Sequence, residues 1–264
     1  MNELYSAVGI SKQGFHQWMD HYMEVLEEQQ QLLPILHQIR ADHPRMSARE
    51  MYRLISPVTM GRDLFESFCF AQGFKIAKQK VYHRTTNSLG VTRFENRTLG
   101  KELTGVNQIW VSDITYYRIM DRFYYLTFIM DLFSRYIVGY SAAHTLLTLH
   151  TTIPALRMAI QKRQPPTGLI IHSDGGGQYY SKEFLAITRN EAMTNSMCEC
   201  VYENAHAERI NGTIKNDYLY PYNPQDFDEL TYSLRKAIKM YNQYRPHKSL
   251  SSLSPYQFEK KYQS

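Results

Sequence analysis

The spacing of apolar residues separates the chain into two parts with different periods. Up to about residue 84, apolar residues recur every three or four positions, which places them on one face of a helix. Residues 4–18 predict a short helix, a turn at Gly9 and a second helix capped by Ser11. This is the spacing with which a helix-turn-helix packs its two helices together.

Further helices are expected in the first part. They cover residues 24–40, interrupted by Pro34, then 47–55 and 61–71. Ser47 begins the middle helix and Glu50 follows three residues later, which is the pattern of a capping box. Residues 1–84 are therefore expected to form a small helical unit.

The second part alternates between strands and helices. Three successive stretches of aromatic and β-branched residues, separated by brief polar breaks, predict antiparallel strands. The predicted strands cover residues 107–119, 122–130, 136–142, 169–172 and about 196–198, and the predicted helices cover 149–162, 182–191, 204–218 and 226–244. This order favours an α/β fold with a mixed sheet flanked by helices.

The two parts are joined by a polar stretch without an apolar period. Residues 85–106 include Gly90, Gly100 and Gly105, which favours a linker. The expected organisation is a helical region over 1–84, a linker over 85–106, a sheet-containing core over 107–225, and a carboxyl-terminal helix and tail over 226–264.

Composition narrows the class of protein. Of 264 residues, 43% are hydrophobic, which suffices for one sizeable core and a smaller unit. No run approaches the roughly 18 to 20 apolar residues that a membrane span needs, and the start lacks a leader pattern, so a cytoplasmic protein is expected. Cys69, Cys198 and Cys200 are too few and too irregularly spaced for a disulfide framework or a zinc clamp, and reduced thiols are expected.

Positive charge is concentrated in one segment. The net charge is only +5, but residues 74–101 hold seven Lys or Arg and one acid. Such a segment suits the neutralisation of DNA phosphates, with a solvated basic linker as the equal alternative. Lys78, Lys80 and Arg84 are its candidate DNA contacts.

Asp113 is the first of three candidate catalytic acids. It lies in mid-strand among apolar residues, where an unpaired carboxylate is costly to desolvate. The alternation of a strand places it on one face with Val111 and Thr115, while Trp110 and Ile114 point to the other face.

Two further acids occupy positions that suit a shared site. Asp174 directly follows an apolar strand and precedes Gly175, at the strand's carboxyl end where open α/β sheets bind ligands. Glu208 lies within an amphipathic helix. Taken singly, each acid has another explanation: Asp113 could form an ion pair with an arginine, Asp174 could be a turn residue, and Glu208 could lie on a solvated helix surface. Their order along the chain favours one site.

Three carboxylates in one place repel each other unless cations lie among them. Hard oxygen ligands favour Mg²⁺ or Mn²⁺, and two such ions, about 3.5 to 4 Å apart, can promote in-line displacement at phosphorus. Asp113, Asp174 and Glu208 are therefore the candidate catalytic and metal-ligating residues, with two ions expected.

The residues around these acids resemble a known family. WVSDITYY, IIHSDGGGQYYS and YENAHAERINGTIKNDYL are similar to the three signature blocks of bacterial insertion-sequence transposases of the OrfB type, and MDLFSRYIVGY and YNQYRPHKSLSSLSP extend the similarity. The resemblance implies an integrase catalytic core with a ribonuclease H-like fold over 107–225, and D,D,E carboxylates at Asp113, Asp174 and Glu208. It also implies metal-dependent strand cleavage and strand transfer on double-stranded DNA.

The chain departs from the family pattern near the third acid. The loop before that block is shorter, and Ile210 and Asn211 stand where the family often has aromatic residues, which bears on local DNA contacts. Lys215, seven residues after Glu208, resembles a family lysine that meets DNA, with a surface lysine as the alternative. Arg209 is a further candidate DNA contact.

Two other residue sets are expected to lie outside the metal site. Asp131 suits a turn or an ion pair with Arg135, and Cys198, Cys200 and His206 have spacing that does not suit zinc.

Two rival functions share much of this pattern. A ribonuclease H-type structure-specific nuclease would cut without joining, and a domesticated DNA-binding protein would have no activity. The basic helical front and the long final helices favour a nucleoprotein assembly, and three intact acids speak against inactivity. The resemblance further implies a homo-oligomer on DNA and an upstream OrfA-type partner or fusion half.

Overall fold

The computed structural model describes residues 9, 11–76, 94–198 and 205–263. The chain divides into two compact units, Met1–Lys80 and Val81–Ser264. Among the helices that are described, none has the length and apolar character needed to cross a membrane.

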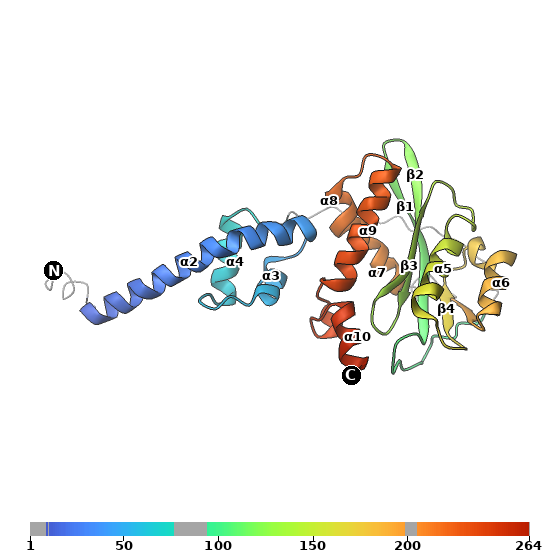
Figure 1. Cartoon of the computed structure of the whole chain (residues 1–264), viewed down its shortest axis with the longest axis horizontal. Coiled ribbons are helices and arrows are strands. Elements are labelled where there is room, and N and C mark those ends of the chain that lie inside the picture. The colour runs from blue at the N-terminus through green and yellow to red at the C-terminus, as the bar shows by residue number, and fades with distance from the viewer. Residues whose placement is uncertain (1–8, 10, 77–93, 199–204, 264) are drawn as a thin grey trace. The chain divides into compact units, whose positions relative to one another are not determined.

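The first unit is helical. Its described helices are α2 (Lys12–Asp42), α3 (Ala48–Ile55) and α4 (Arg62–Ala71) (Figure 1). Leu36, Met51 and Phe65, one from each helix, are fully buried and form the centre of its core. The predicted capping box is present, because Ser47 Oγ accepts from the amide of Glu50 and the Glu50 carboxylate accepts from the amide of Ser47.

Helix α2 is continuous where the sequence predicts a break. The expected interruption at Pro34 is wrong, since one helix of 31 residues contains this proline. A proline inside a helix costs roughly 3 kcal/mol because a backbone hydrogen bond is lost. Leu32 and Leu36, on either side, are both buried, and burial stabilises each by about 1.5–3 kcal/mol, which offsets that cost.

The start of α2 agrees with the predicted turn and cap. Ser11 is the N-cap, and its Oγ accepts from the amide of Gly14 at 3.0 Å. Gly9 has a φ of +71°, the left-handed conformation that favours glycine in turns. The short helix expected before Gly9 lies outside the described residues.

The second unit contains a five-stranded mixed sheet in the order β3-β2-β1-β4-β5. The strands are β1 (Ile109–Ile119), β2 (Arg122–Asp131), β3 (Ile137–Ala143), β4 (Ile170–Ser173) and β5 (Thr194–Met197). The first three are antiparallel because tight turns join them, whereas β4 and β5 run parallel to β1 after helical crossovers. The predicted mixed sheet is confirmed.

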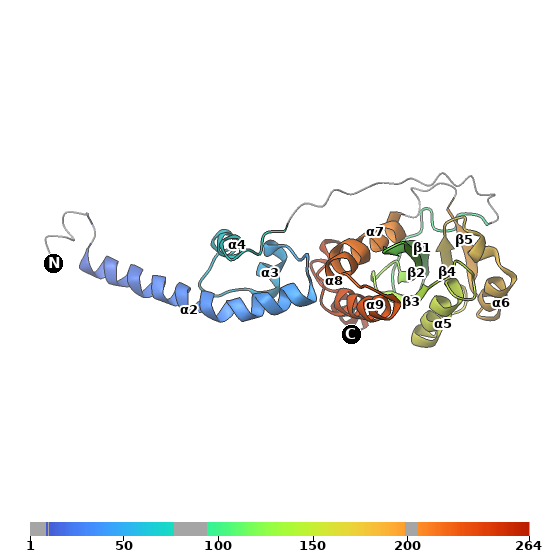
Figure 2. The same cartoon turned by 90° about the horizontal axis from the view of Figure 1, so that it is seen from above.

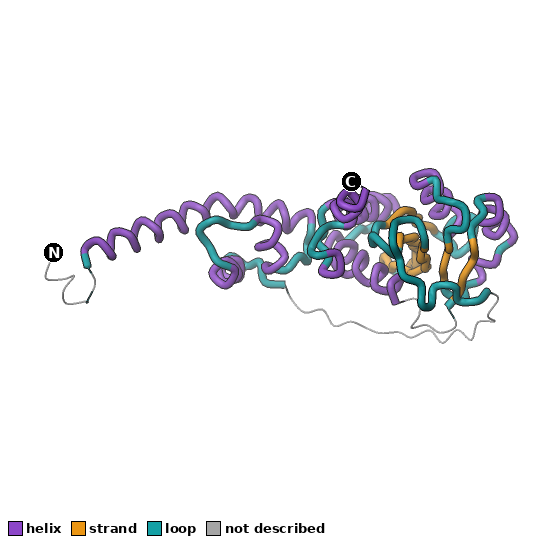
Figure 3. Tube along the Cα trace, turned by 90° about the horizontal axis from the view of Figure 1, so that it is seen from below, coloured by secondary structure: helices purple, strands orange, loops and turns teal. Residues whose placement is uncertain are grey.

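Helices cover both faces of this sheet. They are α5 (Thr152–Arg163), α6 (Lys182–Asn190), α7 (Ala205–Ile214), α8 (Tyr220–Tyr222), α9 (Phe227–Gln243) and α10 (Pro255–Gln263), with a π-helical segment Lys215–Leu219 between α7 and α8 and 3₁₀ turns at Gly177–Tyr180 and Lys248–Leu250. Figures 1 and 2 show α7 and α9 on one side of the sheet and α5 and α6 on the other. In Figure 3 the strands accordingly lie between two helical layers.

The alternation predicted for β1 sorts its side chains between two cores. Val111 packs with Ile210 of α7 on one face, while Trp110 packs with Leu156 of α5 on the other. Ile114 lies against the second core, as the alternation requires. The face of Val111 is therefore the face on which Asp113 meets α7.

Close contact between β3 and α5 depends on Gly139. A Cβ at this position would clash with the carbonyl oxygen of Ala155 and touch the Cβ of Ala159. The missing side chain lets the helix backbone lie directly on the strand.

Part of the stretch expected as a linker contacts the second unit. The ring of Phe94 stacks on that of Tyr180 at a centroid distance of 5.9 Å. The amide of Arg97 donates to Ser196 Oγ of β5 at 2.9 Å. Residues 94–97 thus lie along the edge of the sheet.

The final helix is fixed to the sheet by a buried polar network. Glu259 of α10 accepts from Ser134 Oγ at 2.6 Å and from Arg163 at 2.8 Å, and its side chain is only 8% exposed. The ring of Phe258 meets Phe133 at 5.4 Å. These contacts join α10 to the β2–β3 turn and to the end of α5.

Candidate active site

The pairing of β1 with β4 brings the first two acids together. The parallel register pairs Ser112 of β1 with Ser173, the last residue of β4. The next residues, Asp113 and Asp174, are therefore neighbours. Paired positions in adjacent strands point to the same face and lie about 5 Å apart. The site therefore arises where β4 ends and β1 continues.

Asp113 is held on both carboxylate oxygens. Oδ1 accepts from the amide of Ile114 at 2.8 Å, and Oδ2 accepts from Asn211 Nδ2 at 2.6 Å. Burial raises the pKa of Asp113 to about 8, and the charges of Asp174 and Glu208 add to the increase. The carboxyl thus holds a proton at neutral pH in the absence of a compensating cation.

Asp174 lies at the start of the glycine-rich turn, as predicted. Its Oδ1 accepts from the amide of Gly176 at 3.2 Å. Burial raises the pKa of Asp174, and this hydrogen bond opposes the increase. Beneath the two aspartates, the hydroxyl of Tyr179 and Ser112 Oγ are hydrogen-bonded at 2.8 Å. This buried contact fixes the 3₁₀ turn after Asp174 against β1.

Glu208 lies on the exposed surface of α7. It is close enough to Asp113 to raise the pKa of that residue. Asn211 and Lys215 follow at three and seven positions, which places all three side chains on one face of the helical segment. That face is turned toward β1.

Lys215 contacts β1 beside the first acid. Its Nζ donates to Thr115 Oγ1 at 2.7 Å and approaches the carbonyl oxygen of Tyr116 at 3.4 Å. Burial lowers the pKa of Lys215, while the nearby Asp113 carboxylate opposes the decrease. The ammonium of Lys215 is therefore held on β1 next to Asp113.

The described residues contain no group of three His, Cys, Asp or Glu side chains already gathered around one metal-sized space. The donor chemistry nevertheless fits a hard divalent cation, because two partly buried carboxylates lie side by side with a third nearby. Burial is the main cause of the raised pKa of Asp113, and the charges of Asp174 and Glu208 add a repulsion that a bound cation would relieve.

Asn211 is the site residue that the sequence reasoning missed. The sequence pointed to it only as a departure from the family pattern. Its spacing from Glu208 and from Lys215 is the signal that places it on their face. Its Oδ1 is buried and accepts no hydrogen bond from any described group, so one acceptor next to Asp113 stays available.

Arg209 lies in a cationic cluster with Arg135 and His206. Arg135 donates to Nδ1 of His206 at 2.8 Å. Burial is the main cause that lowers the pKa of Arg135 and of His206, and the charge of Arg209 lowers both further. Neither arginine forms an ion pair with a carboxylate in the described part of the chain. Lys78, Lys80 and Arg84 lie outside the described residues.

Asp131 is confirmed as a turn residue. Its Oδ1 accepts from the amides of Phe133 and Ser134, and its Oδ2 accepts from the amide of Asn107. Its side chain forms no ion pair with Arg135, whose guanidinium meets His206 instead. Cys69 and Cys198 are both buried, and Cys200 lies outside the described residues.

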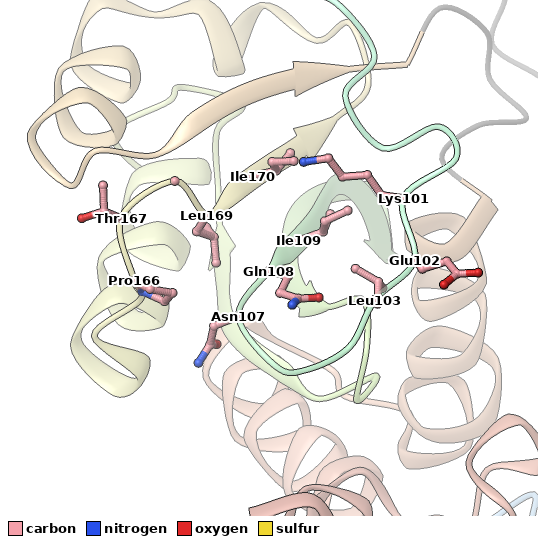
Figure 4. A pocket seen from close by; sticks show the side chains of 11 residues that line it. Lys101, Glu102, Leu103, Asn107, Gln108, Ile109, Pro166, Thr167, Leu169 and Ile170 are labelled. Carbon is pink, nitrogen blue, oxygen red and sulfur yellow. The ribbon is translucent and has the colours of Figure 1, made fainter.

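One pocket of the second unit lies away from the acids. It has a volume of about 310 Å³ and opens at the first residues of β1 and β4, Ile109 and Ile170 (Figure 4). Lys101, Leu103 and Pro166 also line it. Because Asp174 follows the opposite end of β4, this pocket takes no part in the candidate site.

Two known protein families match most of the second unit. An integrase core domain family matches residues 104–201, and a second integrase core domain family matches 199–255. A Shigella sonnei protein described as the insertion element IS600 uncharacterized 31 kDa protein is 32% identical, over 96% of each chain. The Escherichia coli transposase InsF for insertion sequence IS3A is 33% identical, over 60% of this chain and 56% of its own length.

Solved structures share the fold of the second unit. The catalytic core domain of HTLV-2 integrase, solved in complex with magnesium, is 27% identical with a TM-score of 0.50, over 59% of this chain and 98% of its own. A chain of a simian T-cell lymphotropic virus intasome is 22% identical with a TM-score of 0.53. The expected ribonuclease H-like fold is confirmed. The chain belongs to the insertion-sequence transposases that carry an integrase catalytic core.

Proposed function

We propose that this protein cuts and joins DNA strands during transposition, with Asp113, Asp174 and Glu208 as its catalytic acids. The observation that carries the proposal is the register of β1 and β4, which places two carboxylates side by side facing the helix that holds the third. Family membership supports the reaction class, polynucleotidyl transfer.

The three acids are the residues that would hold divalent cations. Magnesium in a related integrase core supports Mg²⁺, with Mn²⁺ as a substitute, and two ions are proposed. Bound there, the ions would supply the Lewis acidity that activates an attacking oxygen and stabilises a leaving oxygen at phosphorus. Asp113 within β1 and Asp174 directly after β4 suit this task because the paired strands hold the two carboxylates at a fixed separation.

The surrounding residues of the chain orient these acids. Asn211 and the amide of Ile114 fix both oxygens of Asp113, so the carboxylate presents its remaining lone pairs in one direction. Lys215, anchored on Thr115, provides a positive charge beside Asp113. We assign it to a phosphate of the DNA strand next to the cleaved bond.

The cationic cluster offers a second phosphate contact. Arg135 and Arg209 lie close together, and neither forms a salt bridge among the described residues, so the two guanidiniums suit an anionic ligand. We assign both to the DNA backbone, together with Lys78, Lys80 and Arg84 of the basic segment. In this proposal the acids bind the metal ions, and the lysines and arginines bind the DNA phosphates.

The proposed oligomer follows from the number of DNA segments that the reaction joins. Two element ends and a target require several double-stranded DNA contacts, so we propose a homo-oligomer on DNA, with an upstream OrfA-type partner or fusion half. The helical region over residues 1–84 is proposed as the DNA-binding region. The linker over 85–106 and the carboxyl-terminal helix and tail over 226–264 are proposed with the bounds given above. The protein would act where bacterial DNA lies, in the cytoplasm at the nucleoid.

Substitution of single acids tests the assignment. Asp174→Asn and Glu208→Gln should abolish both nicking and joining of DNA that carries the element's ends in Mg²⁺, while DNA binding stays largely intact. Glu191→Gln, at an exposed acid of the same unit, is the matched control and should keep full activity. Joining by a pure Asp174→Asn protein would contradict the assignment.

The same assay separates a transposase from a nuclease. A transposase uses a DNA 3′ hydroxyl as nucleophile, so branched or circular joined products are expected. If only simple nicks appear under every metal and partner condition, the structure-specific nuclease becomes the better assignment.

A further inference from the structure

An exposed aromatic surface lies beside the candidate active site. Tyr116 of β1, Phe123 of β2 and Tyr220 of α8 are 47%, 49% and 45% exposed, whereas Tyr117 and Tyr124 on the other face of the hairpin are buried. The rings of Tyr116 and Phe123 meet edge to face at a centroid distance of 5.5 Å. We name these three exposed rings the hairpin aromatic patch.

Tyr220 joins the patch from a separate segment. Its ring lies 5.2 Å from that of Tyr117, and its hydroxyl interacts electrostatically with Tyr116. Tyr220 therefore lies against the hairpin face of Tyr117 and borders the patch near Tyr116.

Cations lie over the rings of the patch. Lys215 Nζ is 5.4 Å from the ring centroid of Tyr116, and the guanidinium of Arg118 is 5.9 Å from that of Phe123. Rings with nearby cations suit a ligand that has both flat π surfaces and negative charge. A nucleotide has both, and of the two cations Arg118 is already paired with Asp121, which leaves Lys215 as the cation for a phosphate.

Lys215 connects the patch with the acids. The side chains of Asp113 and Tyr116 leave β1 on opposite faces, but their backbone positions are only roughly 10 Å apart, and Lys215 Nζ lies 5.4 Å from the ring centroid of Tyr116. About three nucleotides cover a distance of roughly 10 Å at their spacing of 3.4 Å in a stacked strand. Lys215 bridges the interval, since it contacts Thr115 and lies near Asp113.

The chemistry of the patch favours unpaired bases over duplex DNA. Every base has a π face that can stack on an aromatic ring, but in a duplex those faces are already stacked on one another. We propose that the hairpin aromatic patch stacks the unpaired bases of the DNA strand whose phosphate lies at Asp113, Asp174 and Glu208. The proposal rests on the proposed function, because that function supplies the strand.

Binding measurements on the full chain test this proposal without any cleavage. The probes are a fluorescein-labelled single-stranded oligonucleotide, its duplex, and a duplex whose 3′ overhang carries 2-aminopurine, which loses fluorescence when it stacks. Tyr116→Leu and Phe123→Leu should each weaken single-strand binding about tenfold and restore 2-aminopurine fluorescence, with duplex affinity unchanged. Tyr116→Phe, which keeps the ring, and Tyr232→Leu, at a 72% exposed ring outside the patch, should behave like the wild type.

The remaining outcomes overturn the proposal. Equal loss on single strand and duplex would make the surface a general DNA contact. A change in oligomeric state by light scattering, with DNA binding intact, would make it an interface between copies of the chain. Unchanged binding in a normally folded Tyr116→Leu protein would exclude stacking. These experiments measure binding only. A failure of the catalytic assignment would be seen in a different experiment, as strand joining by the Asp174→Asn protein.

Discussion

Asn211 is the uncharged side chain that orients the carboxyl of Asp113, the first of the proposed catalytic acids. Its amide holds Oδ2 of Asp113 while the Ile114 amide holds Oδ1, so the carboxylate cannot rotate without losing one of these bonds. Partners of this kind orient metal ligands, and their loss typically reduces metal affinity or activity by about 10- to 100-fold.

Asn211→Ala should therefore lower the rate of strand joining by about 10- to 100-fold and raise the Mg²⁺ concentration needed for half-maximal rate. A Mg²⁺ titration of joining, with Asn190→Ala as an exposed asparagine control, measures both effects. A normal rate and a normal Mg²⁺ dependence would show that the hydrogen bond is only structural.

His247 carries a predicted pH dependence of stability. Burial lowers the pKa of His247 to about 3, and the charges of Arg245 and Arg135 add to the decrease. The unfolded chain takes up this proton below about pH 6.5 while the folded chain does not. The free energy of unfolding should therefore fall between about pH 6.5 and 3, by up to about 1.4 kcal/mol per pH unit.

Denaturant unfolding of the wild type and of His247→Phe at pH 7, 6 and 5 checks this contribution. The ring of Tyr241, 4.8 Å away, should tolerate the phenylalanine. The variant should show a weaker pH dependence than the wild type and than His150→Gln, a change at an exposed histidine. Parallel curves for all three proteins would exclude His247 as a contributor.

Among the elements, the sequence predicts best where a local pattern has a single solution. The capping box at Ser47, the alternation along β1 and the turn at Asp131 all depend on neighbours in sequence, and all are present. The unbroken α2 and the Asn211 contact depend on packing with distant segments. No local pattern shows whether buried leucines outweigh a proline, or which face of α7 meets β1.

The packing of α5 on β3 gives a prediction at this scale. Gly139→Ala should reduce the free energy of unfolding by about 1–3 kcal/mol or more, because the added methyl group meets the backbone of Ala155, which cannot shift independently of its helix. Gly105→Ala, where a Cβ meets nothing within 4 Å, is the matched control. Equal unfolding midpoints for both variants would mean that α5 moves away easily.

Across the whole molecule, DNA affinity should depend on cations that lie apart from the acids. Each phosphate contact that is lost lowers the slope of log affinity against log salt by about one. Arg209→Gln and Arg135→Gln should each reduce the slope by about that amount, whatever the DNA sequence. A titration of duplex binding from low to high salt measures it, with Arg189→Gln as the control, and an unchanged slope would remove these arginines from the DNA interface.

The buried carboxylate of Glu259 limits how far the reading frame can be shortened at its 3′ end. A stop codon at or before position 259 would leave the guanidinium of Arg163 buried without its partner, and the loss of one member of such a pair costs about 3–5 kcal/mol. A copy of the element truncated there would encode an unstable protein, although the codons for Asp113, Asp174 and Glu208 remained. Copies with small deletions near the 3′ end of the reading frame should therefore be immobile unless another copy supplies the enzyme.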